Sequence, residues 1–204
     1  MIQILEIGSD RRRPLNWTVA NLPDFDATFV PYKIWNDEQF DAAYSEHFIE
    51  HIHRFEGIRF LEEMKRVLKP GGVLRIAWPS MDFVDWLIYE AAEDDEYIEE
   101  YIRYWLALKE QHDSGPYAHF YYPPPDPLRT WKENTIRGVL HQNGEHRYLW
   151  YTNELKDMLQ FLGFEDVRVV KTEESRLPEF ESVEDMRHIL RRLDTTIIEC
   201  NKPL

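Results

Sequence analysis

Two histidines and a glutamate stand close together in the string His47-Phe48-Ile49-Glu50-His51. An imidazole titrates near neutral pH, so His47 or His51 could take a proton from a reacting group, with Glu50 in support. The same H-x-x-E-H spacing could bind zinc on one face of a helix, as in inverzincin proteases, with a further ligand from His119, His141 or His146. The alternative to a base is a structural role for His51 and a loop-facing position for His47. Because so short a string often matches by chance, we assign no metal.

A second group of candidate substrate-binding and catalytic residues lies in the Pro- and aromatic-rich stretch 113–150. Tyr121, Tyr122 and Trp131 could stack on a sugar or another flat substrate, and His146 could reach an acceptor hydroxyl. The alternatives are an aromatic satellite core or dimer contact, and a plain Asn-Gly turn near His146. Long loops of this kind are usually functional, so we expect a substrate lid.

The composition limits the classes of protein that can carry these residues. A chain of 204 residues suits one domain, 1–204, with a helical and aromatic insertion at 81–150. A net charge of −14 repels phosphate backbones and disfavours a nucleic-acid partner. Cys200 is the only cysteine, which excludes an internal disulfide and a cysteine-based zinc site and favours the cytoplasm. No apolar stretch approaches the roughly 18 residues of a membrane span.

The middle of the chain predicts a βαβ unit. A strand at 40–45 leads into a helix-like segment around 48–52, and a helix follows at 57–68 with an apolar face. The turn Lys69-Pro70-Gly71-Gly72 ends that helix, and Val73 to Trp78 forms a central strand. Such a unit implies a parallel sheet with a right-handed crossover.

The two ends of the chain predict shorter elements. Strands are expected at 2–7, 18–20 and 27–30, with no helix between residues 9 and 40. A helix with Thr152 as N-cap ends at Gly163. Strands are expected at 166–170 and 195–200, and between them Ser182 and Asp185 form a capping pair for one more helix.

Four stretches in this order carry a family resemblance. They are Leu5-Glu6-Ile7-Gly8, then residues 40–52, then Arg66 to Ile76 around the Pro-Gly-Gly turn, and finally Tyr151 to Val170. Together they resemble the class I S-adenosylmethionine-dependent methyltransferases, especially the type 11 branch. The resemblance implies an α/β fold: a seven-stranded, mostly parallel Rossmann-like sheet with an antiparallel last strand, a helix-poor N-terminal half and an insertion after the fifth strand.

The resemblance also implies a cofactor and its binding residues. S-adenosylmethionine would bind at the carboxyl ends of the first, second and fourth strands, at Glu6, Gly8, Ser9, Asn21, Ser45 and Glu46. Asn21 stands where the family has an acid that holds the ribose hydroxyls, and its amide could hold one of them. The first three motifs are degenerate, with Gly8 as the only glycine of the first. The run Arg11-Arg12-Arg13 could pair with the cofactor carboxylate or an anionic substrate, although we favour a solvated turn.

The function implied is methyl transfer to a small polar acceptor, such as a sugar or a glycan precursor. In-line displacement needs donor and acceptor held collinear, and a base where the acceptor must lose a proton. His47 is the best candidate base, with Glu50 or His51 supporting it. The alternative is a methyltransferase-like binding or scaffold protein without catalysis, which the degenerate motifs favour. A homodimer stays open.

Overall fold

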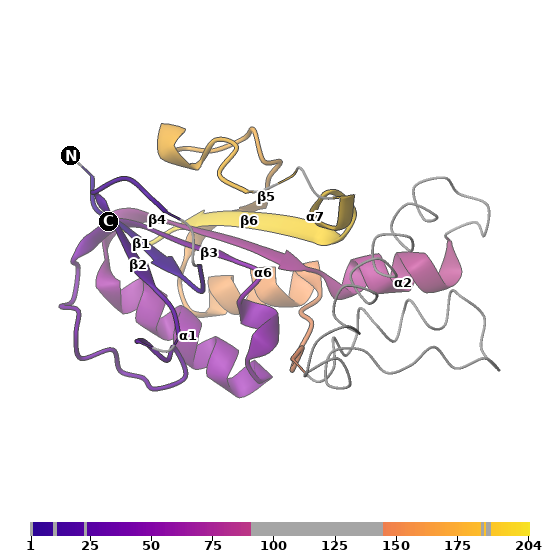
Figure 1. Ribbon diagram of the computed structural model, residues 1–204, viewed down its shortest axis with the longest axis horizontal. Coiled ribbons are helices and arrows are strands. Elements are labelled where there is room, and N and C mark those ends of the chain that lie inside the picture. Colours follow the sequence, from indigo (N-terminus) through magenta and orange to yellow (C-terminus); the bar gives the residue numbers. More distant parts are fainter. Residues whose placement is uncertain (1, 10–11, 23, 91–144, 185, 187–188) are drawn as a thin grey trace, which may run out of the picture.

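The computed structural model describes residues 2–9, 12–22, 24–90, 145–184, 186 and 189–204. Its core is one mixed sheet whose strands are β1 (Ile4–Ile7), β2 (Trp17–Ala20), β3 (Phe40–Glu46), β4 (Leu68–Pro79), β5 (Glu165–Val169) and β6 (Thr195–Asn201). The strand order is β2-β1-β3-β4-β6-β5 (Figure 1). The first four strands pair in parallel, and β6 runs antiparallel to both β4 and β5.

The described residues form six strands where seven were expected. The strand predicted at 27–30 is a turn, because the Asp26 Oδ1 accepts hydrogen bonds from the Thr28 amide at 2.9 Å and the Thr28 hydroxyl at 2.7 Å. The Phe29 amide then donates to the Asp26 carbonyl. A side chain that bonds its own neighbouring backbone in this way stabilises a turn in place of a sheet ladder.

The predicted βαβ unit is present as β3, α1 (Arg54–Val67) and β4. The turn predicted at Lys69–Gly72 is part of β4 instead, which begins at Leu68 directly after α1. The helix begins three residues earlier than expected because His53 and Glu56 form a capping box at its start. Its apolar side packs on the sheet beside α6 (Thr152–Phe161), and Figure 1 shows both helices on the same face. Phe60, Leu61, Met64 and Val67 of α1 and Leu155 and Leu159 of α6 are buried there.

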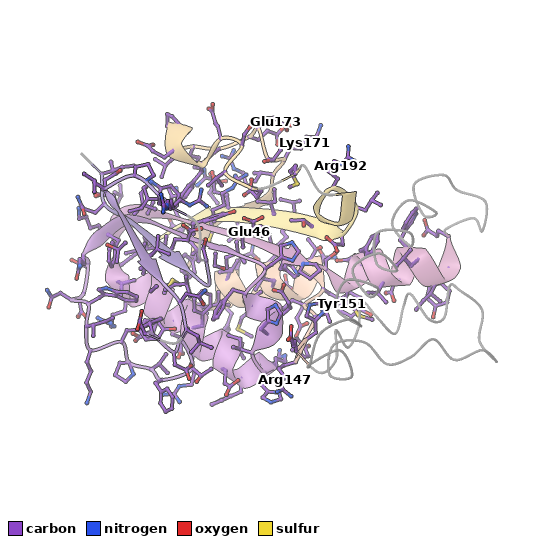
Figure 2. All side chains as sticks on the ribbon, in the orientation of Figure 1. Glu46, Arg147, Tyr151, Lys171, Glu173 and Arg192 are labelled. Atoms are coloured by element: carbon purple, nitrogen blue, oxygen red, sulfur yellow. The ribbon has the colours of Figure 1, made fainter. Side chains whose placement is uncertain are left out.

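The opposite face of the sheet buries charges. Arg75 and Glu199 lie side by side on β4 and β6 and are fully buried. The Arg75 guanidinium donates to both carboxylate oxygens of Glu184, at 2.6 and 3.0 Å, and to Glu199 at 3.2 Å. It also donates to the carbonyls of Lys171, Thr172 and Glu174. Figure 2 shows Lys171 and Glu173 on this side of the sheet, and Arg147 and Tyr151 on the side of α1 and α6.

Three local structures differ from those that the sequence predicted. The segment around 48–52 forms one 3-10 turn, η1 (Ile49–His51). Tyr151 is the N-cap of α6, and Thr152 donates its amide and hydroxyl to Asp82 at 2.7 and 2.5 Å. Ser182 has a left-handed φ of 56° and starts no helix.

The remaining helices among the described residues are short. They are α2 (Met81–Tyr89), η3 (Pro178–Phe180) and α7 (Ile189–Asp194). Before η1, the described residues contain no helix, as the sequence predicted. Among the helices described, none combines the length and the apolar character needed to cross a bilayer. Asp185 and most of the predicted insertion at 81–150 lie outside the described residues.

Candidate functional site

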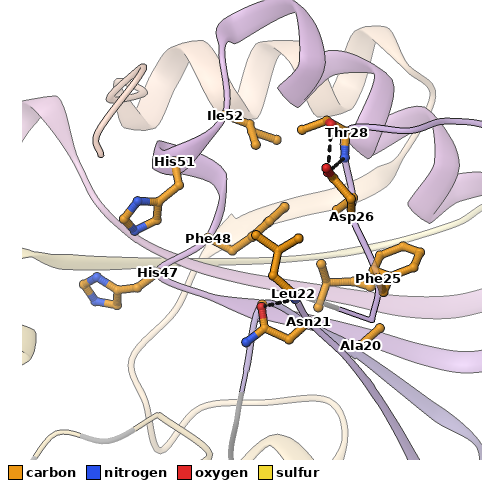
Figure 3. Close-up of a pocket in the computed structure, with 13 residues that line it drawn as sticks. Ala20, Asn21, Leu22, Phe25, Asp26, Thr28, His47, Phe48, His51 and Ile52 are labelled. Atoms are coloured by element: carbon orange, nitrogen blue, oxygen red, sulfur yellow. Dashed lines mark hydrogen bonds between the residues drawn. The ribbon is translucent and has the colours of Figure 1, made fainter. Parts of the chain in front are cut away.

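A cavity of about 440 Å³ opens at the carboxyl ends of β1, β2 and β3 (Figure 3). The three strands are neighbours, and in register Ile7 lies beside Ala20 on one side and Ser45 on the other. Ligands of open α/β sheets bind at this edge. The cavity is lined by Ile7, Gly8, Ala20, Asn21, Leu22, Phe25, Asp26, Ala27, Thr28, His47, Phe48, His51 and Ile52.

Gly8 directly follows β1 and forms one wall of the cavity. Its φ is +85°, a conformation that residues with a Cβ rarely adopt. A Cβ built there would lie 2.8 Å from the Phe48 Cβ, so the chain can turn under Phe48 only with glycine at this position. The Gly8 amide donates to the Ala20 carbonyl at 2.9 Å, which ties the ends of β1 and β2 together.

Asn21 follows the last residue of β2 and lines the cavity. Its Oδ1 accepts a hydrogen bond from the Leu22 amide at 2.9 Å. The side chain is exposed. The loop that follows brings Leu22 and Phe25 to the cavity, so the polar amide stands next to an apolar surface.

His47 follows β3 and also lines the cavity. Its φ of 49° is left-handed, and its amide donates to the Ala77 carbonyl at 2.8 Å. Its Nε2 lies 2.9 Å from the Thr195 hydroxyl and its Nδ1 lies 3.3 Å from the Glu50 carboxylate. Non-glycine residues in this conformation are uncommon and gather at functional sites.

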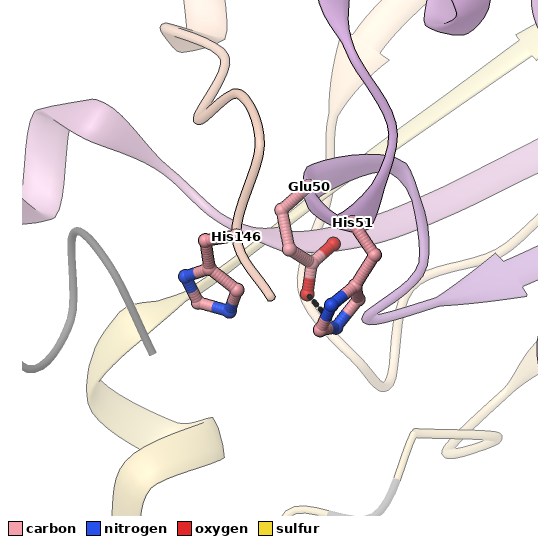
Figure 4. Close-up of side chains that lie close together, drawn as sticks. All are labelled: Glu50, His51 and His146. Carbon is pink, nitrogen blue, oxygen red and sulfur yellow. Dashed lines mark ion pairs between the residues drawn. The ribbon is translucent and has the colours of Figure 1, made fainter. Parts of the chain in front are cut away.

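Glu50, His51 and His146 form a cluster beside the cavity (Figure 4). The His51 Nε2 lies 3.7 Å from the Glu50 Oε1, and the rings of His51 and His146 are 5.1 Å apart. The Glu50 side chain is fully buried. Burial raises the pKa of the Glu50 carboxyl, but the imidazoles of His47, His51 and His146 outweigh it and hold that pKa below its usual range.

The backbone brings the two parts of this cluster together. The amides of Arg147 and Tyr148 both donate to the Glu50 carbonyl, at 2.7 and 3.2 Å. The described end of the predicted lid, residues 145–150, therefore lies at the His47 edge of the sheet. All four residues predicted for catalysis are thus close to one another.

Glu6 lies beside Tyr44, and Tyr44 lies beside Arg75, so Glu6 is on the sheet face opposite α1 and α6. It is not among the residues that line the cavity. Arg13 donates to both of its carboxylate oxygens, at 2.6 and 2.7 Å. Burial lowers the pKa of the Arg13 guanidinium, and the bonds to Glu6 outweigh this and raise it. Arg13 also lies over the Trp17 ring at 4.8 Å. The predicted solvated turn is wrong at this residue, because Arg13 neutralises a buried carboxylate.

Of the predicted cofactor residues, Ser9, Ser45 and Glu46 do not line the cavity either, whereas Gly8 and Asn21 do. Ser45 is buried within β3, and its hydroxyl has no hydrogen-bond partner among the described residues. Glu46 accepts a hydrogen bond from the Tyr44 hydroxyl at 2.9 Å. Ser9 is partly exposed next to Gly8. Tyr121, Tyr122 and Trp131 lie outside the described residues.

Sequence reasoning missed the part of the cavity wall formed by the loop after β2. Leu22, Phe25, Asp26 and Thr28 all reach the cavity. The Asp-x-Thr spacing of Asp26 and Thr28 is a turn signal that would have located this loop. The charge pair of Glu6 and Arg13 had no local signal, since seven positions and a chain reversal separate them.

Known proteins with a similar sequence or structure support the fold assignment. The family model of a methyltransferase domain matches residues 13–76, from just before β2 into β4. Among solved structures, the CurJ carbon methyltransferase superposes with a TM-score of 0.51 at 11% identity, over all of this chain and 49% of that one. The resemblance to class I methyltransferases is confirmed. The chain has their fold, and it spans about half the length of that structure.

Two further structures superpose with lower TM-scores. An S-adenosylmethionine-dependent methyltransferase of Archaeoglobus fulgidus matches with a TM-score of 0.47 at 15% identity, over 98% of this chain and 86% of that one. A phosphoethanolamine N-methyltransferase of Haemonchus contortus, in complex with S-adenosylmethionine, matches with a TM-score of 0.42 at 14% identity, over 93% and 38% of the two chains. No curated protein sequence matches this chain.

Proposed function

We propose that this protein transfers a methyl group from S-adenosylmethionine to a small polar acceptor, such as a sugar or a glycan precursor. The observation that carries the proposal is the cavity at the carboxyl ends of β1, β2 and β3, where Gly8, Asn21 and His47 meet. Its volume of about 440 Å³ lies in the range of small-molecule sites. The class I methyltransferase fold makes S-adenosylmethionine the cofactor to test first.

The residues of the cavity fit the nucleoside part of that cofactor. The Asn21 amide can donate to one ribose hydroxyl, and Leu22, Phe25 and Ile52 offer an apolar surface to a flat base. Gly8 leaves the backbone at the end of β1 without a side chain of its own. When bound, S-adenosylmethionine supplies a methyl group activated by its sulfonium charge. The roles of Ser9, Ser45 and Glu46 are proposed to be backbone ones, at the ends of β1 and β3.

His47 is the proposed base. The Glu50 carboxylate lies 3.3 Å from its Nδ1 and would stabilise the imidazolium that forms when the ring takes a proton from an acceptor hydroxyl. Glu50 and His51 act as positioning residues in this scheme. His146 completes the same edge from the segment before α6, and Tyr121, Tyr122 and Trp131 remain proposed acceptor contacts.

A second candidate function is binding without catalysis. It is favoured by the Glu6–Arg13 pair, because the acid of the first family motif is already satisfied by a guanidinium of the same chain. Either activity would suit the cytoplasm, a location we propose from the single, buried Cys200.

Calorimetry with S-adenosylhomocysteine tests the proposed cofactor site. We expect saturable binding of one molecule per chain, and tighter binding by Asn21→Asp, because a carboxylate accepts from both ribose hydroxyls. The matched control is Asn36→Asp, which adds the same charge at an exposed position outside the cavity and should leave affinity unchanged. Absence of saturable binding by the wild-type protein would overturn the proposal, and equal affinity of Asn21→Asp and wild type would overturn the role of Asn21.

A further inference from the structure

The Glu50 carboxylate is buried in an unusual environment. Its side chain is fully buried, yet neither carboxylate oxygen accepts a hydrogen bond from the described residues. A buried charge normally has hydrogen bonds or a metal to compensate for lost hydration. Two imidazoles stand beside it, with the His47 Nδ1 at 3.3 Å and the His51 Nε2 at 3.7 Å from the Glu50 Oε1.

The orientation of His51 follows from its other contact. Its Nδ1 lies 3.2 Å from the Glu145 carbonyl oxygen, which can only accept, so Nδ1 carries the hydrogen and donates. In the neutral ring the lone pair is then on Nε2, which faces the Glu50 Oε1. A histidine that donates one ring N–H to a backbone carbonyl and offers the other nitrogen is the usual arrangement of a metal ligand.

We propose that Glu50, His51 and His146 bind one divalent transition-metal ion, and that Zn²⁺ suits them best. Each residue offers one ligand atom, and these atoms lie within 4.8 Å of one another. Two imidazoles and one carboxylate form a zinc ligand set that leaves a fourth position for water or a substrate atom. Tetrahedral ligand atoms on zinc lie about 3.4 Å apart, so small side-chain rotations close the site.

The main chain already holds this site in place. His146 is anchored by the two amides that follow it, because Arg147 and Tyr148 donate to the carbonyl of Glu50 itself. These two hydrogen bonds to one carbonyl hold His146 next to Glu50 and His51, although the ligands come from distant parts of the sequence. The site adjoins the cavity, since His51 belongs to both. Ion binding does not depend on methyl transfer and is measured directly.

The test is calorimetric titration of chelator-treated protein with Zn²⁺ alone. The wild-type protein should bind one ion per chain at this site, and His146→Ala and His51→Gln should each weaken that event at least tenfold. The control is His53→Asn, which removes an exposed histidine next to the cluster and keeps a good N-cap for α1. It should bind as the wild type does.

Circular dichroism checks that each variant is folded. Two results would overturn the proposal. One is a wild-type protein that takes up no Zn²⁺, which would assign the cluster to protonated imidazoles around Glu50. The other is equal Zn²⁺ affinity in wild type and in whichever of the two variants folds, which would place the ion elsewhere in the chain.

Discussion

Neighbouring residues of the same strand face two different environments in this sheet. Leu74 and Ile198 pack under α1 and α6 in the apolar core, whereas the next residues, Arg75 and Glu199, point to the other face and form a buried ionic network. That second face is covered by the connection between β5 and β6, whose backbone carbonyls accept from Arg75. A sheet face can thus be closed by a loop when fixed charges bind the loop's backbone.

The two faces also differ in how each tolerates change. An apolar face is stabilised by many weak contacts, and losing one side chain leaves a cavity. A buried ionic network depends on complete pairing, because removal of one partner leaves the other charge buried and uncompensated. This contrast predicts that the loss of unfolding free energy depends on pH for a variant in the ionic network and not for a variant on the apolar face.

The largest effect is expected from Arg75→Met. The variant leaves Glu184 buried without its guanidinium and removes one of the cations that contact Glu199, and it should lose about 3–5 kcal/mol of unfolding free energy at pH 7. A buried carboxylate that has lost its cation is more stable in its neutral form, so the folded variant takes up a proton at Glu184. The loss should therefore shrink as the pH falls from 7 toward 5, as measured by urea unfolding at each pH.

Arg168→Met is the control for this change. Arg168 also contacts Glu199, at 3.2 Å, but its side chain is 45% exposed, so its removal should cost under about 1 kcal/mol. A loss for Arg75→Met no larger than that of the control would show that the network contributes little.

A somewhat smaller effect is expected on the apolar face from Leu155→Ala. Leu155 of α6 is fully buried in the core, and its truncation should cost about 2–4 kcal/mol through lost burial and a residual cavity. No charge is left unpaired, so this loss should be equal at pH 7 and pH 5 in the same urea experiment. Phe161→Ala on the exposed side of α6 should cost under about 0.5 kcal/mol. A loss for Leu155→Ala that shrinks with pH as that of Arg75→Met does would remove the distinction between the two faces.

The apolar face could be predicted from the sequence because its signals are local. The spacing of Phe60, Leu61, Met64 and Val67 predicts α1, and the apolar run from Val73 to Trp78 predicts the larger part of β4. The sheet edge with Gly8, Asn21 and His47 could be predicted for the same reason, since each residue directly follows a strand.

The buried ionic network on the opposite face and the full Glu50 cluster depend on distant contacts instead. Arg75 meets Glu184 and Glu199 only after the chain has crossed the sheet again. His146 lies near Glu50 because the amides of Arg147 and Tyr148 donate to the Glu50 carbonyl, and no sequence pattern predicts these hydrogen bonds. The predicted strand at 27–30 is wrong because one carboxylate, that of Asp26, turns the backbone locally. Side-chain to backbone bonds of this kind are weakly encoded in hydrophobic periodicity.

Hydrogen exchange in the presence of saturating S-adenosylhomocysteine tests the central claim most directly, namely that the cofactor binds at the carboxyl ends of β1, β2 and β3. A bound ligand slows exchange of the amides that it orders or covers. We predict slower exchange at residues 7–9, 20–28 and 47–52, with no change at 171–184, which cover the opposite face of the sheet. Slowing confined to 171–184, or no slowing in any of these segments, would contradict the account.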